Sequence, residues 1–194
     1  MRFFTTEVYP ERDLICHCKK NLQEEKMDKY VELAKKAVEK YIKVGKVLSH
    51  KNILEEFTKE KAGVFVSIKK KGELRGCIGT IYPTKNNVVE EIISNAISSS
   101  TRDPRFFPVE REELKLLTYS VDILSEPEKI EKMSRLNPKK YGVVVKSGHK
   151  TGLLLPDLEG VDTPEMQVNI AKSKAGIFPD EEFEIYRFTV TRYK

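Results

Sequence analysis

Three segments carry apolar residues at helical spacing, between residues that favour helix ends. The first begins at Asp28, a candidate N-cap, and ends at Gly45, which can adopt the left-handed conformation that closes a helix. The second begins at Asn87, and the third, over 163–176, has a threonine cap followed by proline and a glycine end. A further segment, 52–57, is a candidate for a shorter helix.

Runs rich in β-branched and aromatic residues predict the strands. The runs 63–69 and 73–81 are joined by a glycine-bearing turn, which predicts a hairpin, and 141–156 predicts another. Apolar and polar side chains alternate over 117–123, which predicts a strand with one buried face. The last apolar run, 183–193, predicts a single final strand.

This order of elements favours an α+β fold over regular βαβ repeats, because strands follow one another in hairpins. We expect a mixed or antiparallel sheet with helices packed on it. If the chain has two lobes, the polar, proline-bearing segment 125–140 is the best boundary, and the final strand could return to the first lobe.

Size and composition indicate a globular protein that stays in the cytoplasm. Among 194 residues, 39% are hydrophobic, which suffices for a substantial core. No run approaches the roughly 18 apolar residues of a membrane span, and the N-terminus lacks the pattern of a secretion signal. Three cysteines cannot all pair within one chain, so we expect free thiols in a reducing compartment.

The charge balance gives little support to a nucleic-acid partner. The chain has 35 basic and 30 acidic residues, a net charge of +5, so its surface is highly charged with a slight positive excess. Charge alone therefore neither establishes nor excludes a nucleic-acid partner.

The segment LRGCIGT, residues 74–80, is the main candidate for a site. Alternate residues of a strand share a face, so Arg75, Cys77 and Gly79 are expected on one side. The guanidinium of Arg75 would favour the thiolate form of Cys77, while Gly76 and Gly79 remove bulk where a ligand or another backbone could approach. Three roles stay open for Cys77: a small buried hydrophobe, a ligand contact, or a nucleophile.

A second candidate is RDPRFFP, over 102–108. Arg102 and Arg105 stand beside two phenylalanines, a mixture that can bind phosphate or stack on a base. In the competing interpretation, Asp103 pairs with an arginine to rigidify a turn, and the phenylalanines enter the core. Even then, either arginine could lie at the rim of a cleft.

Motifs for metals and cofactors are weak, and we expect none. Cys16, His17 and Cys18 lack the second ligand pair that zinc sites use. The acidic residues over 157–165 depart from an EF-hand spacing, and SGHKTG at 147–152 lacks the first glycine of a phosphate loop.

The chain resembles the AMME-syndrome critical-region family, the AMMECR-type domain, and more narrowly the prokaryotic group called AmmeMemoRadiSam system protein A. The resemblance covers roughly 27–194 and rests on five motifs in the expected order: LRGCIGT, DPRFFPV at 103–109, YSVDILSEPEKI at 119–130, GLLLPDLEGVDTPEMQ at 152–167 and KAGI at 174–177. The family's most characteristic motif falls on 74–79 without departure.

The resemblance implies a two-lobed protein with a cleft between the lobes. We expect an N-terminal extension over 1–26, a larger lobe over 27–128 plus 181–194, and a smaller lobe over 129–180. The group's name implies a MEMO-type protein and a radical S-adenosylmethionine protein as partners. No biochemical activity is established for the family.

Two functions are therefore compared, and whether the protein is an enzyme stays open. The first is a module that binds a ligand or a partner in a cleft at the LRGCIG motif, with Arg75, Gly76, Gly79, Arg102 and Arg105 as ligand contacts. It is preferred because spacing identifies no general base, metal set or oxyanion device. The second is a thiol-dependent enzyme acting on nucleic acid or a nucleotide, with Cys77 as nucleophile.

Overall fold

The computed structural model describes residues 29–49 and 60–194. Several sequence expectations lie outside these residues: the N-terminal extension over 1–26 with its Cys16–Cys18 segment, the N-cap at Asp28 and the short helix over 52–57.

Where their ends are described, the helices begin and end as the sequence predicts. The first covers 29–44, and Gly45 follows it with a φ of 67°. α3 covers Val88–Thr101, and the side chain of Asn87 accepts a backbone N–H of its first turn. α4 covers Pro164–Ala175, with the expected threonine cap and left-handed glycine end. Two 3-10 helices are also present: η1 (Arg111–Leu116) between α3 and β3, and η2 (Met133–Arg135) between β4 and β5.

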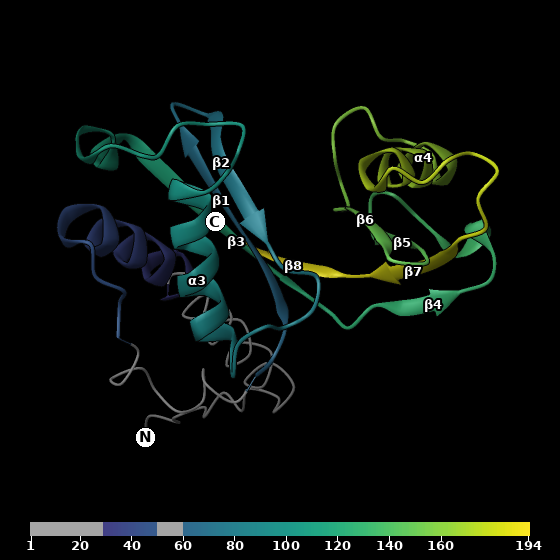
Figure 1. The fold of residues 1–194 in the computed structure, drawn as a ribbon, viewed down its shortest axis with the longest axis horizontal. Coiled ribbons are helices and arrows are strands. Elements are labelled where there is room, and N and C mark those ends of the chain that lie inside the picture. Colours follow the sequence, from purple (N-terminus) through teal and green to yellow (C-terminus); the bar gives the residue numbers. More distant parts are fainter. Residues whose placement is uncertain (1–28, 50–59) are drawn as a thin grey trace, which may run out of the picture.

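The strands form two four-stranded antiparallel sheets, in the orders β2-β1-β3-β8 and β4-β7-β5-β6. Helices beside antiparallel sheets make an α+β fold, as predicted (Figure 1). The bounds of the strands are β1 Gly63–Lys70, β2 Glu73–Gly79, β3 Leu117–Leu124, β4 Glu128–Ile130, β5 Gly142–Ser147, β6 Lys150–Leu154, β7 Glu184–Phe188 and β8 Val190–Tyr193.

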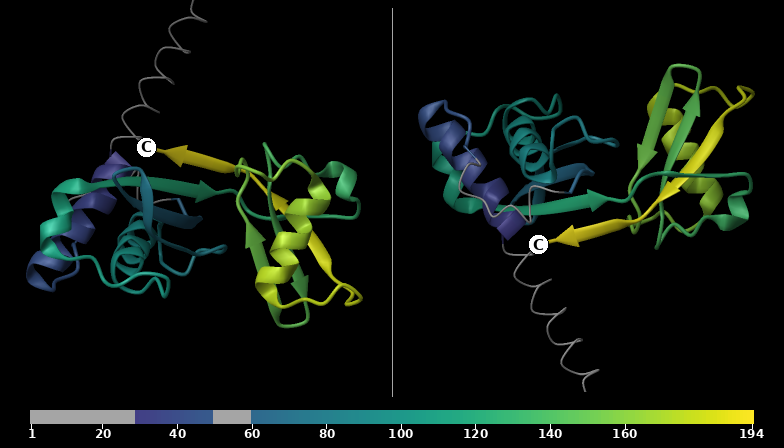
Figure 2. Two further views of the ribbon diagram at one scale, coloured as in Figure 1. Left: turned by 90° about the horizontal axis from the view of Figure 1, so that it is seen from above. Right: turned by 90° about the horizontal axis from the view of Figure 1, so that it is seen from below.

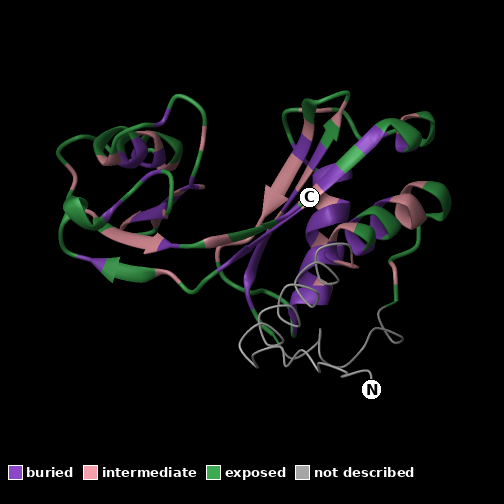
Figure 3. Cartoon of the chain, turned by 180° about the vertical axis from the view of Figure 1, so that it is seen from behind, coloured by how far each residue is buried: buried purple, intermediate pink, exposed green. Residues whose placement is uncertain are grey.

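One face of the first sheet is buried under α3 and the helix over 29–44. Apolar side chains from these helices meet those of β1 and β3 in one core, to which Val66 and Val121 contribute from the sheet and Ile92 from α3. Buried positions accordingly run through α3 (Figure 3). Among the described residues, no helix covers the opposite face of this sheet. The LRGCIG motif lies on β2, at one edge of the sheet.

The second sheet has its own core against α4, with Val143 and Val145 of β5 facing Val168 of the helix. Between them, Val144 points to the other side, where it meets Leu124 and Phe188 in a small apolar cluster. Because this cluster combines residues of both sheets, it joins the first sheet to the second. All three central valines of β5 are buried, which confirms the predicted burial of that strand on both faces.

The predicted final strand is two strands in different sheets. β7 pairs with β5, whereas β8 pairs with β3, and the chain crosses from one sheet to the other at Thr189 (Figure 2). A continuous apolar run does not reveal such a crossing, because both strands are apolar. β7 and β8, which the sequence predicts as one strand, therefore belong to different sheets.

No helix of the described residues is both long and apolar enough to cross a membrane.

Candidate functional site

Cys77 lies on β2, an edge strand, with its side chain on the face opposite α3. Val66 and Ile68 of β1 are buried beneath α3, so Ser67 between them points to the other face. Ser67 pairs with Cys77 on one side and with Ser120 of β3 on the other. These three small, partly exposed side chains form a row across the sheet.

Arg75 does not join this row, contrary to the expectation that it shares a face with Cys77. A bulge in the β1–β2 pairing makes Arg75 the extra residue of β2, which interrupts the strict alternation of side chains. Its Nε and Nη2 donate to the Glu113 carboxylate at 3.1 and 2.8 Å. Nη1 also donates to the Phe107 carbonyl oxygen at 2.8 Å, and Nη2 to that of Pro108 at 3.2 Å. The guanidinium therefore holds a loop and η1 against β2.

Neighbouring atoms of the protein fill the space beside both motif glycines. A Cβ on Gly76 would lie 2.1 Å from the backbone oxygen of Ser99 in α3. One on Gly79 would lie 2.2 Å from the ring of Phe65. The Ile78 N–H also donates to Ser99 Oγ at 2.8 Å, so the motif packs directly on α3.

Asp103 and Arg105 hold the backbone of Cys77 at the outer edge of the sheet. The Cys77 N–H donates to Asp103 Oδ2 at 2.8 Å, and Arg105 Nη2 donates to the Cys77 carbonyl oxygen at 3.3 Å. Arg105 also donates to both oxygens of Asp103, at 2.9 and 2.7 Å, and these bonds keep the pKa of that buried carboxyl at about 2. The predicted Asp-Arg pair is present, but Phe107 is 88% exposed, so the expectation that both phenylalanines enter the core is wrong.

Burial raises the pKa of the Cys77 thiol, where the sequence predicted a lowered one. The hydroxyl of Ser67 lies 3.2 Å from Sγ and donates to it, and Arg105 is the cation that favours the thiolate. Neither effect offsets the loss of water around the sulfur. The arrangement keeps Cys77 in the thiol form at neutral pH.

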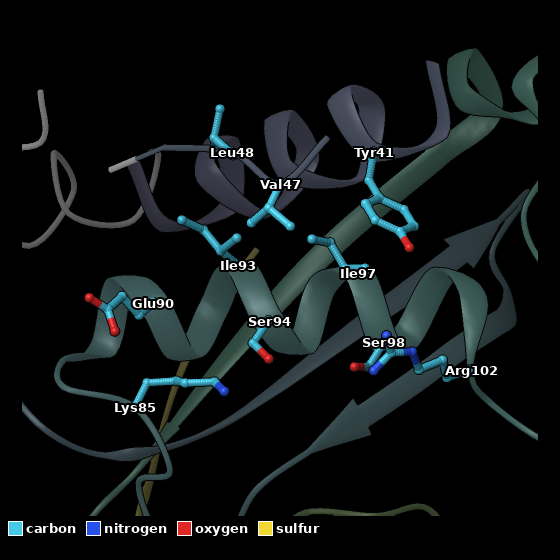
Figure 4. A pocket seen from close by; sticks show the side chains of 10 residues that line it. All are labelled: Tyr41, Val47, Leu48, Lys85, Glu90, Ile93, Ser94, Ile97, Ser98 and Arg102. Atoms are coloured by element: carbon cyan, nitrogen blue, oxygen red, sulfur yellow. The ribbon is translucent and has the colours of Figure 1, made fainter. Parts of the chain in front are cut away.

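Arg102 lies apart from the Cys77 row, in a pocket of about 460 Å³ on the outer side of α3 (Figure 4). Ile93 and Ile97 of α3 face Val47 and Leu48 there, with Arg102 at the C-terminal end of the helix. The motif RDPRFFP thus sends its two arginines to different places, Arg105 to the sheet edge and Arg102 to this pocket.

The same face of the sheet carries a buried ion pair that the sequence did not predict. Asp122 of β3 accepts two bonds from Arg192 of β8, at 2.7 and 2.9 Å, and its side chain is 4% exposed. Alternation placed Asp122 on the polar face of its strand, and that part is right. Its burial depends on Arg192, 70 positions away in the sequence, and no local signal announces that pairing.

No cluster of three or more histidine, cysteine, aspartate or glutamate side chains that could hold a metal ion exists among 29–49 and 60–194. His149 is the one histidine in the described part of the chain. It lies in the β5–β6 turn of the second sheet, whereas Cys77 lies on β2 of the first. The sequence SGHKTG forms that hairpin and no phosphate loop.

Comparison with known proteins gives consistent results. A protein of Thermotoga maritima is 54% identical over 168 residues, which cover 85% of this chain and 97% of that protein. A protein of Clostridium acetobutylicum is 48% identical over 174 residues, and these span 89% of this chain but only 37% of that longer protein. The crystal structure of an uncharacterized protein from Pyrococcus horikoshii superposes with a TM-score of 0.77 at 35% identity, covering 85% of this chain and 89% of that one.

The family model AMMECR1 matches residues 31–193, which include the LRGCIG strand, both sheets and α4. This range agrees with the extent of the resemblance noted in the sequence. The chain belongs to the AMMECR1 family.

Proposed function

We propose that this protein is a binding module and that its ligand or partner contacts the row formed by Cys77, Ser67 and Ser120. The observation that carries the proposal is the state of the Cys77 thiol. Burial raises its pKa, and the Ser67 hydroxyl donates to it, whereas a nucleophile needs the thiolate.

The surroundings of the motif support the same conclusion. The guanidinium of Arg75 is occupied by Glu113, and Gly76 serves the close approach of α3. Most of the motif therefore builds the sheet and its contact with the helix. What it leaves for a ligand is the small side chain of Cys77, the hydroxyls beside it, and the half-exposed guanidinium of Arg105 at the edge.

The partners implied by the resemblance are the first candidates for this surface. A MEMO-type protein or a radical S-adenosylmethionine protein, in the cytoplasm, could cover the small side chains of the row with a segment of its own chain. Nucleic acid is a weaker candidate. Phosphate contacts make binding fall steeply with salt, so a salt titration with RNA and DNA tests it directly.

Alkylation of the native protein tests the proposal. Iodoacetamide is applied across a range of pH, and the rate at Cys77 is read by peptide mass spectrometry, which separates it from Cys16 and Cys18. We expect Cys77 to react only above the ordinary thiol pKa of about 8.5, and the same peptide to react normally in urea. Rapid reaction of native Cys77 at neutral pH would favour the thiol-dependent enzyme instead.

Protection by a partner tests the other half of the proposal. A purified MEMO-type or radical S-adenosylmethionine protein from the same genome is added before alkylation at high pH. A partner that covers the row slows the reaction at Cys77, and a Ser120→Lys variant, which places a long charged side chain in the row, should lose this protection. Alkylation that no candidate partner slows counts against this surface.

A further inference from the structure

A basic hollow lies where the first sheet meets the loops of the second, and the Cys77 site does not include it. Its volume is about 470 Å³, which is within the range of small-molecule sites. Arg192 and Lys194 line it from β8 and the residue after it. Lys139 and Lys140 line it from the segment before β5, and Asp157 from the loop after β6.

Four cationic side chains and one carboxylate side chain, that of Asp157, line this hollow. Lys139 is partly occupied, by an exposed ion pair with Asp162 at 3.2 Å, and such pairs are weak. Lys140 lies 5.1 Å from the centre of the Tyr141 ring, and it has no carboxylate partner within the described residues. Lys194 likewise forms no ion pair with any residue that the structure describes. Arg192 is paired with Asp122 and Lys139 with Asp162, so Lys140 and Lys194 are the two cations of the hollow that have no carboxylate partner among the described residues.

The guanidinium of Arg192 is oriented by its hydrogen bonds to Asp122. Its Nε and Nη2 are bound to the buried Asp122, so the plane of the guanidinium is fixed. Nη1 makes no hydrogen bond to the described residues, and the side chain keeps 33% of its surface exposed. A guanidinium oriented in this way loses little conformational freedom when it binds an anion, and its donors match the oxygens of phosphate.

Asp157 adds a hydrogen-bond acceptor at the rim. Its backbone has a φ of 56°, in the left-handed region that few residues other than glycine adopt, and its N–H donates to the Pro138 carbonyl oxygen at 2.8 Å. This bond fixes the loop that carries the carboxylate.

We propose that this hollow binds a small phosphorylated molecule, whose phosphate contacts Arg192, Lys140 and Lys194 and whose hydroxyl groups donate to Asp157. The two lysines without a carboxylate partner and the exposed edge of Arg192 select the phosphate. The single carboxylate selects against a bare polyanion and for a ligand that also offers donors, such as a sugar phosphate.

Titrations of the whole chain with inorganic phosphate and with ribose 5-phosphate test the proposal, with ribose as the phosphate-free control. Binding is followed by backbone amide NMR, and the largest shifts are expected at Asp157 and Arg192. Ribose should not bind. The double variant Lys140→Gln, Lys194→Gln should weaken both phosphate probes at least about tenfold, because it removes two charge-assisted hydrogen bonds to the phosphate.

A second variant is expected to strengthen phosphate binding, a result that unfolding cannot produce. Asparagine tolerates the left-handed conformation, so Asp157→Asn keeps the loop while it removes the negative charge. Inorganic phosphate should then bind several-fold more tightly, and the advantage of ribose 5-phosphate over inorganic phosphate should shrink.

The matched control is Lys132→Gln with Lys174→Gln, two exposed lysines away from the hollow, and it should bind as the wild type does. The proposal is overturned if neither phosphate probe gives a saturable shift at millimolar concentration. It is also overturned if the shifts map elsewhere, or if the Lys140, Lys194 variant binds like this control.

Discussion

Replacing Gly76 by alanine should destabilise the protein strongly, because no room exists for one methyl group. The new Cβ would lie 2.1 Å from the Ser99 backbone oxygen, whereas ordinary contacts begin at 3.4 Å. β2 and α3 would have to separate by roughly the difference, and overpacking of this kind costs about 1–3 kcal/mol or more. Separation also stretches the bond from Ile78 N–H to Ser99 Oγ, which contributes about 1 kcal/mol.

We therefore expect a loss of about 2–4 kcal/mol in the free energy of unfolding, measured by urea denaturation with circular dichroism. The control is Gly148→Ala in the β5–β6 turn, where a Cβ meets nothing within 4 Å and only the φ of 56° is unfavourable. Its cost should be about 1–2 kcal/mol. If Gly76→Ala costs less than this control, the close approach of α3 is not the reason for glycine at this position.

Three further predictions concern the stability in acid, the contact between Lys146 and Tyr82, and the exposed ring of Phe107. Asp103 and Glu113 have pKa values of about 2, below their unfolded values, so each contributes on the order of 2 kcal/mol of stability above pH ~5 that is lost as the pH falls toward 2. Asp103→Asn and Glu113→Gln should each flatten the stability profile measured over that range, and unchanged profiles would contradict the assignment. The Nζ of Lys146 lies 4.8 Å from the ring centre of Tyr82 and donates to its hydroxyl. Lys146→Met should therefore speed hydrogen exchange in the loop after β2 and lower the free energy of unfolding by about 1 kcal/mol. Unaltered exchange in that loop would argue against this contact. Phe107→Ser should change the unfolding free energy by less than about 0.5 kcal/mol, because the ring is 88% exposed, and a larger loss would mean that the ring is packed.

The helices and hairpins were predictable because their signals are local. Asn87 and Gly45 are capping residues next to the apolar stripes that they bound, and a turn with φ values of 53° at Lys71 and 89° at Gly72 joins β1 to β2. Each of these features involves residues a few positions apart. The α+β class follows from their order along the chain.

The details of the site depend on long-range contacts and could not be predicted in the same way. Strand alternation placed Arg75 beside Cys77, but a bulge interrupts the alternation, and Glu113 on a distant 3-10 helix holds the guanidinium. Likewise, Asp122 is buried only because β8 returns from the second sheet to bring Arg192 beside it. The pKa of Cys77 follows from its burial, which no pattern of neighbours in sequence specifies.

The contacts at the edge of the sheet limit how a partner can reach Cys77. An edge strand normally offers free N–H and C=O groups for the addition of another strand. On β2, the N–H of Cys77 is bound by Asp103 and its carbonyl oxygen by Arg105, and the low pKa of Asp103 shows that its charged form is strongly held. A peptide that added to this edge would have to displace a buried, ion-paired carboxylate. Approach over the face that carries Ser67 and Ser120 requires no such displacement, so we expect the proposed partner to contact the face of the sheet and not its edge.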